Sequence, residues 1–565
     1  MRRLARDILM MALATGISRL LGLFRDVAIA DRFGASGVYD AFLIAFFVPH
    51  FLRQLFAEGA LSTAFVPSYT GLRVAGEDAD RFASALLSWS ILLFAAVVGL
   101  GVWLAPVYVP FLASGFAPEK LTLAVGLTRI VFPFIALVGF AAVFMGILNA
   151  HRRFFAASAA PIWFNVGMIL GVLVLAPRFP EQPVLGLAVG ALIGGAGQLL
   201  AQIPALLRVG FRFRPTFWPI HPEIHRLVRL MAPAVLILAV TQVNLLVDNK
   251  LASYLGDGGI SSLQYGMRLF QLPLGVFAVS VATALLPRFS EARAREDDAR
   301  FSSYLGDGIA LSALVLLPAM VGLLAIGADV VRLLFEHGSF TPDDTLRTAR
   351  VLSFYLIGLF PYGLVYLFSR AFYALRRTRL PLLAATAAVG VNVALDLALV
   401  STMREAGLAL ATGISGVVNA VLLGLFLIPR MRFPWRHLGV VGVGSGALYV
   451  DCLSLTVAGT SGGPSATVRW RGRSSRRSSP ASSSTSCTSG RRRSGPWSGG
   501  SGGTAEDRRW NRRGTPPRYP AAGEGTSDRK RVSSSAPAIT SRSSSSLARR
   551  SRTDRLLFRR PFAFS

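Results

Sequence analysis

Apolar residues run in long stretches along the first 430 residues of this chain, and short polar loops separate them. A stretch of about 20 apolar residues can cross the ~30 Å hydrocarbon core of a bilayer as an α-helix. The pattern predicts an all-α polytopic membrane protein with spans near residues 8–31, 40–68, 83–111, 122–148, 157–176, 184–206, 226–250, 262–286, 302–327, 350–374, 380–401 and 406–428, and a weaker thirteenth candidate at 438–458.

The composition agrees with a membrane protein. Of the 565 residues, 52% are hydrophobic and only 16% are charged, whereas soluble domains carry roughly 25% charged residues. Both cysteines, Cys452 and Cys487, lie beyond residue 450, so neither disulfides nor thiolate metal sites support the body. We find no catalytic motif, and we therefore predict a protein that is not an enzyme and has no cofactor other than a candidate coupling ion.

The net charge of +29 is concentrated at the end of the chain. Residues 461–565 carry 23 of the 59 Lys and Arg residues but 5 of the 30 Asp and Glu residues, in a segment rich in Ser, Arg, Gly and Pro. Such a composition cannot bury a core. Two interpretations fit, a disordered basic cytoplasmic tail or a frameshifted translation of a GC-rich gene, and neither indicates a nucleic-acid partner.

Basic residues mark one side of the membrane. The N-terminal Arg2 and Arg3, and the loops that carry Arg152 and Arg376, fall on the same side if the twelve spans alternate. Cytoplasmic loops are enriched in Lys and Arg, so we predict a cytoplasmic N-terminus. Because Arg19 interrupts the first apolar run, that run predicts a transmembrane helix and not a cleavable signal peptide.

Short motifs recur at offsets of about 220 residues. Residues 63–67 end the second span as residues 283–287 end the eighth, and residues 150–153 follow the fourth span as residues 374–377 follow the tenth. Six spans separate the copies, so both have the same orientation. We predict two parallel-related bundles around a central cavity, a transporter arrangement, with an N-terminal bundle at 1–220, a C-terminal bundle at 221–430, a weak span at 431–460 and the tail at 461–565.

Several ionisable residues lie within predicted spans, where a charge costs a few kcal/mol or more. They are Arg19, Arg25 and Asp26 in the first span, Asp40 and Arg53 in the second, and Arg268 in the eighth. One interpretation is a set of structural ion pairs, such as Arg25 with Asp26. The other is an anion-binding cavity, because the four arginines exceed the nearby carboxylates and guanidinium suits phosphate oxygens.

The same segments resemble a known family. Residues 18–26, 40–42, 49–60 and 65–67, followed by Arg268, residues 273–275, 335–341 and 371–374, are similar to the MurJ/MviN lipid II flippases. The resemblance covers about residues 5–430 and implies a multidrug/oligosaccharidyl-lipid/polysaccharide (MOP) exporter fold with a cationic cavity. It implies that Arg19, Arg25, Arg53 and Arg268 engage the lipid-linked diphosphate, with Asp26 and Asp40 as nearby acidic positions. The chain departs from many relatives at Gln271, where they carry an acidic residue.

A second constellation lies in the predicted C-terminal bundle. Asn392 and Asp396 share a face of the eleventh span, with Thr412 on the twelfth and Asp248 on the seventh. Oxygen ligands suit a hard cation such as Na⁺, and the resemblance implies a sodium site at similar positions. A buried hydrogen-bond network is the other interpretation. From the bundle assignment we expect these four residues to lie away from the arginines.

These observations predict a lipid II flippase of the bacterial inner membrane. It would move the undecaprenyl-diphosphate-linked peptidoglycan precursor from the cytoplasmic to the outer leaflet, among membrane lipids and cell-wall synthesis machinery. Two alternatives remain open, an exporter of the same fold with another lipid-linked oligosaccharide, and a non-transporting membrane scaffold. A drug exporter would need an acidic cavity, which the surplus of arginine disfavours.

Overall fold

The structure is a computed structural model that describes residues 2–54, 61–218 and 221–427. The predicted weak span at 431–460 and the predicted tail at 461–565 lie outside the described residues. Within them the protein contains α-helices with short π and 3-10 turns and no strand, as the apolar pattern predicts.

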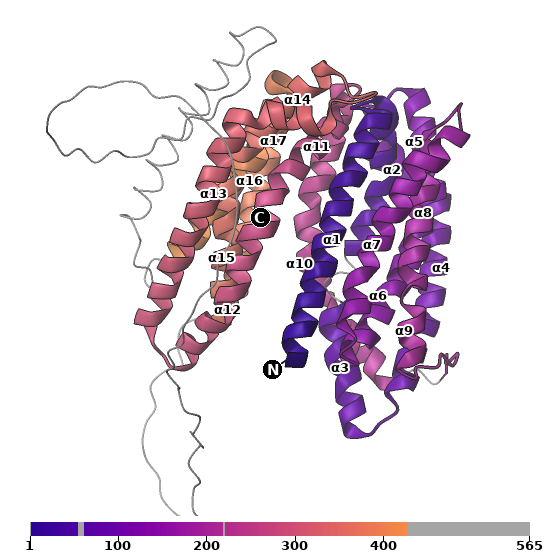
Figure 1. Ribbon diagram of the computed structural model, residues 1–565, viewed down its shortest axis with the longest axis vertical. Helices are drawn as coiled ribbons and strands as arrows, with labels where there is room; N and C mark the ends of the chain where they lie inside the picture. The colour runs from indigo at the N-terminus through magenta and orange to yellow at the C-terminus, as the bar shows by residue number, and fades with distance from the viewer. Residues whose placement is uncertain (1, 55–60, 219–220, 428–565) are drawn as a thin grey trace, which may run out of the picture. The chain divides into compact units, whose positions relative to one another are not determined.

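The first group of helices occupies the indigo to magenta part of Figure 1. It consists of α1 (Arg2–Phe33), α2 (Gly37–Arg53), α3 (Leu61–Ala75), α4 (Ala79–Leu112), α5 (Pro118–Val131), α6 (Phe134–Ala150), α7 (Phe154–Leu170), a π turn (Gly171–Leu175), a 3-10 turn (Ala176–Arg178), α8 (Val184–Leu200) and α9 (Ile203–Arg208). Helix α1 packs on α7, α7 on α8, and α2 on α5.

The second group follows in the chain. It consists of α10 (Pro222–Ala252), a 3-10 turn (Ser253–Leu255), α11 (Gly259–Pro273), a π turn (Leu274–Ala278), α12 (Val279–Ala294), α13 (Asp298–Phe335), α14 (Pro342–Leu356), α15 (Leu359–Ala374), α16 (Arg379–Met403) and α17 (Glu405–Leu427). Helix α16 packs on α17, α12 on α15, and α13 on α14. Helix α10 contacts α3 and α4 as well as α16, so the predicted boundary at residue 220 stays a prediction.

The predicted spans coincide with these helices. Each of the twelve corresponds to one helix or to two or more consecutive helices. Among the described residues, eight helical segments are long and apolar enough to cross a membrane, or nine if α14 and α15, bent by 45°, form one span.

The internal repeat is visible in the backbone of equivalent turns. Arg152 and Arg376 both adopt the left-handed conformation, with φ of 57° and 56°. The next residue in each turn closes the helix in the same way, since Arg153 donates its N–H to Leu148 O (2.8 Å) and Arg377 donates to Phe372 O (3.0 Å). These bonds satisfy helix-end carbonyls in the manner of a Schellman cap. The repeat predicted from short motifs thus extends to the conformation of the turn.

Glycine allows α7 and α8 to approach closely. A Cβ atom added at Gly167 would lie 2.3 Å from the backbone of Gly194, and one added at Gly190 would lie 2.6 Å from the Cα of Gly171. Small residues at such crossings let helix backbones touch within a membrane.

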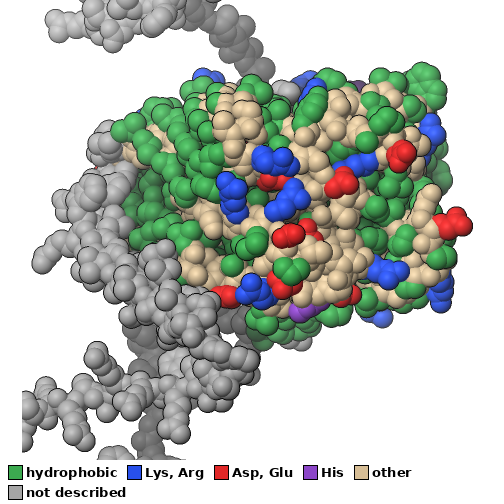
Figure 2. Space-filling view, turned by 90° about the horizontal axis from the view of Figure 1, so that it is seen from above, with side chains coloured by type: hydrophobic (Ala, Val, Ile, Leu, Met, Phe, Trp, Pro, Cys, Tyr) green, Lys and Arg blue, Asp and Glu red, His purple; other side chains and the backbone are tan. Residues whose placement is uncertain are grey.

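The two groups of helices meet at the end where α1 finishes and α2 begins. Helix α11 contacts α2 there, and α13 contacts α1. Seen from above, this end gathers acidic and basic side chains near its middle, with hydrophobic side chains around them (Figure 2). The ionic contacts among them include residues of both groups and are described with the site below.

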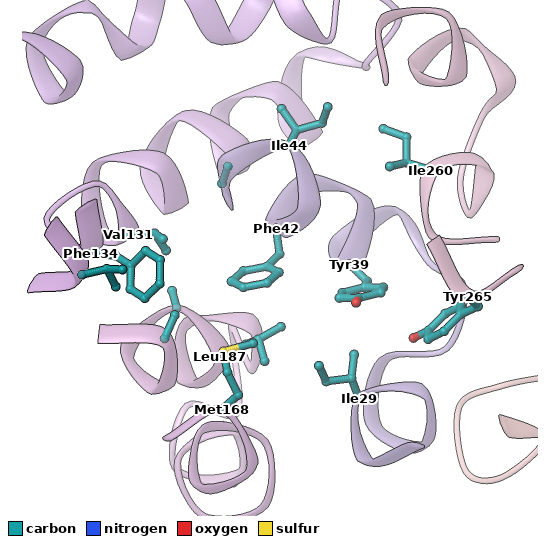
Figure 3. Close-up of a cluster of buried hydrophobic side chains, with 14 of the residues drawn as sticks. Ile29, Tyr39, Phe42, Ile44, Val131, Phe134, Met168, Leu187, Ile260 and Tyr265 are labelled. Atoms are coloured by element: carbon teal, nitrogen blue, oxygen red, sulfur yellow. The ribbon is translucent and has the colours of Figure 1, made fainter. Parts of the chain in front are cut away.

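A buried apolar cluster continues from the first group into α11 (Figure 3). The ring of Tyr39 in α2 lies 5.6 Å from that of Tyr265 in α11, and Phe42 stacks on Tyr39 at 6.3 Å. Tyr265 also donates its hydroxyl to Gly34 O (3.2 Å). This packing holds α11 against the first group at one end.

Candidate functional site

A cavity lies between the two groups of helices. Its volume is about 730 Å³, and its lining comes from α1 and α7 on one side and from α10, α11, α15, α16 and α17 on the other. Ligand sites of transporters built from repeated bundles lie at such an interface between the repeats.

One half of this cavity is basic. Arg19, Arg25 and Asp26 of α1 and Arg268 of α11 line it together. Asp26 accepts two hydrogen bonds from the guanidinium of Arg25 (2.6 and 3.0 Å) and lies 3.4 Å from Nε of Arg268. The Asp26 carboxylate therefore bridges α1 and α11, and it is one negative charge against three positive ones.

The arginines differ in how they are held. Arg25 is 9% exposed and donates a further hydrogen bond to Asn165 Oδ1 of α7 (3.0 Å). Asn165 in turn donates to the carbonyl oxygen of Ser18 (2.9 Å), so it ties the guanidinium back to α1. The Arg268 side chain, in contrast, is 40% exposed. Arg25 is fixed by its partners, while Arg268 keeps donors free to face a ligand.

Arg19 depends on the irregular stretch after α11. An added Cβ at Gly275, in the π turn, would lie 3.0 Å from Nη1 of Arg19. Glycine at this position makes room for the guanidinium. Proline ends α11 at Pro273, and π turns of this kind are frequent at functional sites.

Asp40 is buried elsewhere. Its carboxylate accepts hydrogen bonds from the backbone N–H groups of Gly258 (2.9 Å) and Ser261 (2.8 Å) at the start of α11, and from the Ser261 hydroxyl (2.9 Å). Lys120 of α5 completes the shell at 2.9 Å. A carboxylate at a helix N-terminus is stabilised by the helix dipole. Asp40 thus joins the two groups of helices and does not line the described cavity.

Further polar contacts surround Asp40 at this end. Lys120 also contacts Asp257 (2.8 Å), and Arg347 pairs with Glu405 and donates to Asp257 O (2.8 Å). The Ser339 N–H donates to Asp31 O (2.7 Å). We call the set Asp40, Lys120, Asp257, Gly258 and Ser261 the interbundle latch, since it holds the first group to α11.

Arg53 also lies outside the lining of the cavity. Its guanidinium is 3.4 Å from Nδ1 of His50, and the other ring nitrogen of His50 is 3.1 Å from the Gln54 amide. Gln54 is hydrogen-bonded to Gln242 of α10. This polar chain joins the end of α2 to α10.

The other half of the cavity is lined by oxygen atoms. Asp248 and Asn244 of α10 and Thr412, Ser415 and Asn419 of α17 contribute to it. The carboxyl groups of Asp248 and Asp396 interact directly, and Asn392 donates to Asp396 Oδ1 (3.4 Å). The structure therefore brings Asp248, Asn392 and Asp396 together, and Thr412 lines the same cavity as Asp248.

Two of these four residues do not lie apart from the arginines as expected. Asp248 and Thr412 line the same cavity as Arg19, Arg25 and Arg268. The expectation was wrong because the two groups face each other across a shared space, and because Arg268 on α11 itself belongs to the second group.

Several buried oxygen atoms here lack a hydrogen-bond donor among the described residues. They are Oδ1 of Asp248, Oδ2 of Asp396 and the side-chain oxygens of Asn244, Asn392 and Asn419. Uncompensated buried oxygens are costly, and hard cations such as Na⁺ take oxygen ligands of this kind. The residues present therefore fit a cation, although the described residues contain no cluster of three or more His, Cys, Asp or Glu side chains with metal-site geometry.

Sequence reasoning missed Asn165, Asn244, Ser415 and Asn419. Asn165 is a polar side chain within the apolar fifth span, and it is 6% exposed. The rule that flagged the intramembrane arginines applies to a buried amide in the same way, so the signal for it was present.

Comparison with known proteins identifies the family to which the chain belongs. The family model "Lipid II flippase MurJ" matches residues 29–460. The chain is 38% identical to the "Probable lipid II flippase MurJ" of Thermotoga maritima over 75% of this chain and 85% of that protein. It is 32% identical to the "Lipid II flippase MurJ" of Burkholderia cenocepacia over 76% of this chain and 84% of that protein.

Solved structures agree. One titled "Lipid II flippase MurJ, inward closed conformation" superposes with a TM-score of 0.71 at 32% identity, covering 79% of this chain and 93% of that chain. An inward-facing multidrug resistance MATE transporter of the MOP superfamily superposes with a TM-score of 0.62 at 17% identity, over 73% of this chain and 94% of that chain, and shows the shared fold. The family match, the curated relatives and the common fold lead to one conclusion. This chain belongs to the lipid II flippase MurJ family.

Proposed function

We propose that this chain flips lipid II across the bacterial inner membrane by taking the diphosphate of the lipid into the basic half of the cavity. The observation that carries the proposal is the convergence of Arg19, Arg25 and Arg268 on one cavity in which the Asp26 carboxylate bridges Arg25 and Arg268. The surplus positive charge suits a diphosphate, and the guanidinium fork suits its oxygens. The activity is transport, and the protein is not an enzyme.

Arg25 and Arg268 have different roles in this scheme. Arg25, held by Asp26 and Asn165, presents a fixed positive charge. Arg268 is 40% exposed and shares Asp26 through one longer contact, so an incoming phosphate can replace that contact. Asp26 would then remain paired with Arg25. Substrate binding on this scheme weakens the Asp26 bridge between α1 and α11.

The direction of transport follows from the proposed orientation. With the N-terminus in the cytoplasm, the interbundle latch lies at the outward end of the cavity. The head group enters from the cytoplasmic side, the latch opens, and the bundles rock to expose the cavity outward. The undecaprenyl chain stays in the bilayer. Cell-wall synthesis machinery that produces and consumes the precursor would be the partner on each side.

Na⁺ is the proposed coupling ion. Asp248, Asn392, Asp396 and Thr412 would hold it, and its charge would offset the repulsion between the two carboxyl groups. Because Asp248 lies on the cavity shared with the arginines, the ion would also change the charge that the diphosphate meets.

The test is complementation of a flippase-depleted bacterium with leaflet-resolved labelling of lipid II. We expect wild-type protein to restore labelling at the outer leaflet, and an Arg19→Ala/Arg268→Ala variant to restore none at equal protein levels. Growth without flipping would indicate a scaffold. Flipping of another lipid-linked oligosaccharide in preference to lipid II would assign a different cargo.

A further inference from the structure

A second cavity lies at the ends of spans in the first group of helices. Its volume is about 400 Å³, and it is lined by α1, by the residues around the α6–α7 turn and by α9. Arg152 and Arg153 belong to this turn, and Arg208 is the last residue of α9. All three therefore stand where an apolar span ends, at the level of the membrane surface.

Among the side chains that the structure describes, which on α1 begin at residue 9, the three arginines have no carboxylate partner. This distinguishes them from Arg25, Lys120 and Arg347, each of which contacts an Asp or Glu. Unpaired guanidinium groups that converge on one cavity favour an anion, and their planar donors match phosphate oxygens.

The remaining lining is apolar. Phe154, Phe155 and Met10 contribute to the walls, and the Phe155 and Met10 side chains are 50% and 37% exposed. Trp163, further along α7, is 47% exposed. A small inorganic anion gains nothing from aromatic and aliphatic walls, whereas the glycerol backbone and acyl chains of a lipid do.

This cavity faces away from the transport cavity. Met10 precedes Arg19 by nine residues on α1, and at about 100° per residue this places the two side chains on opposite sides of the helix. A ligand beside Met10 therefore does not enter the space between the bundles. The position favours a bulk phospholipid over the transported lipid.

We propose that this basic cavity binds the phosphate head group of an anionic glycerophospholipid in the leaflet on the N-terminal side. Arg152, Arg153 and Arg208 would contact the phosphate, and Phe155 and Met10 would flank the acyl chains. Basic pockets between membrane helices recognise lipid head groups in this way. Because α1 carries Arg19, Arg25 and Asp26, the lipid would hold the helix that presents the charges of the transport cavity. The site does not depend on the proposed cargo.

The experiment uses the full-length protein in a neutral detergent. Binding of dihexanoyl phosphatidylglycerol is measured by the shift in thermal unfolding midpoint as lipid is added, with dihexanoyl phosphatidylcholine and inorganic phosphate as comparison ligands. The variants are Arg152→Gln/Arg153→Gln and Arg208→Gln. The matched control is Arg376→Gln/Arg377→Gln, which removes the same charge from the equivalent turn of the second group. The positive φ of Arg376, 56°, matches the 57° of Arg152, so both double variants place a glutamine in the same backbone conformation.

We expect phosphatidylglycerol to stabilise the wild type and the control at the same concentrations. The apparent affinity should fall about tenfold or more in the Arg152/Arg153 variant and severalfold in Arg208→Gln, since each basic residue near an anionic lipid is worth about 1 kcal/mol. Equal losses in the control would indicate non-specific attraction and overturn the site. Equal stabilisation by inorganic phosphate would overturn the lipid assignment, as would displacement of phosphatidylglycerol by undecaprenyl diphosphate.

Discussion

Arg25 and Arg268 line the same cavity, but they differ in how many buried groups would lose a partner if the side chain were removed. Arg25 is buried and makes hydrogen bonds to Asp26 and Asn165, so its guanidinium satisfies groups that are already part of the fold. Arg268 touches Asp26 at 3.4 Å and is otherwise turned to the cavity. Arg25 therefore contributes both to the stability of the fold and to the positive charge of the cavity, whereas Arg268 contributes mainly to that charge.

We predict that Arg268→Ala abolishes flipping while leaving the thermal midpoint near that of the wild type. Arg25→Ala should also abolish flipping, and it should lower stability by about 3 kcal/mol because Asp26 loses its buried partner. Arg268→Lys should recover only part of the activity, since lysine lacks the two-pronged donor. Outer-leaflet lipid II labelling and unfolding of purified protein measure the two effects.

Arg300→Ala is the control for this comparison, because Arg300 forms an exposed pair with Asp297 and such pairs contribute little. Arg300→Ala should retain wild-type flipping and a wild-type thermal midpoint. Wild-type flipping by Arg268→Ala at normal protein levels would contradict the cationic-cavity mechanism.

The oxygen-lined half of the cavity leads to a second prediction at this scale. If Na⁺ sits between Asp248 and Asp396, then Na⁺ but not K⁺ should raise the thermal midpoint of the wild type, because a ligand that binds only the folded state stabilises it. Asp396→Asn should lose the response. Equal effects of both salts, or an unchanged response in Asp396→Asn, would leave only the hydrogen-bond network.

At the scale of helices, sequence pattern predicted more of the fold than of the site. Each predicted span falls on one helix or on consecutive helices of the described residues, because a helix is the form in which one apolar stretch satisfies its own backbone in lipid. Eight or nine of those helical segments are long and apolar enough to cross a membrane. The π turn at Leu274–Ala278 could not be predicted from the apolar pattern. In this turn Gly275 lies against the guanidinium of Arg19, and a contact between segments so far apart in the chain leaves no signal in the local sequence.

For the site, too, the sequence predicted some features, and others became visible only in the fold. Charge at membrane depth singled out Arg19, Arg25, Asp26 and Arg268, and the fold places all four on one cavity, while their role in binding stays a prediction. The same rule placed Asp40 beside them, and only the fold reveals that its carboxylate is taken up by the start of α11 and by Lys120. The rule detects the cost of burying a charge, but it does not say whether a ligand or another helix compensates it.

A second pair of equivalent turns allows a test in which two substitutions should shift the thermal midpoint in opposite directions. Gly76 and Glu296 are 220 residues apart and both have positive φ, 75° and 54°. A side chain in this conformation costs about 1 kcal/mol, and a Cβ at Gly76 would meet no atom within 4 Å. Gly76→Ala should therefore lower the thermal midpoint through the backbone alone, and Glu296→Gly should raise it. The two single variants are compared with the wild type in the same detergent, and shifts of the same sign would contradict the shared turn geometry.

For the whole molecule, alternating access requires the interbundle latch to open. Gly37 at the start of α2 lies against Asp257, because a Cβ added at Gly37 would be 2.4 Å from the Asp257 carboxylate. A Gly37→Cys/Asp257→Cys pair, in a background with Cys452 and Cys487 replaced by serine, should form a disulfide across the latch. Under oxidation this bond should stop flipping, and a reductant should restore it, because rocking separates the two groups of helices at this end.

The Asp257→Cys variant alone controls for the loss of the Lys120–Asp257 contact at 2.8 Å, and neither single cysteine variant should respond to oxidant or reductant. The fraction cross-linked is read from gel mobility after cleavage between the two groups, and flipping from outer-leaflet lipid II. If fully cross-linked protein flips lipid II at the wild-type rate, the latch does not open during transport. The substrate would then have to leave by a route that keeps α2 and α11 together, and the rocking scheme would be wrong.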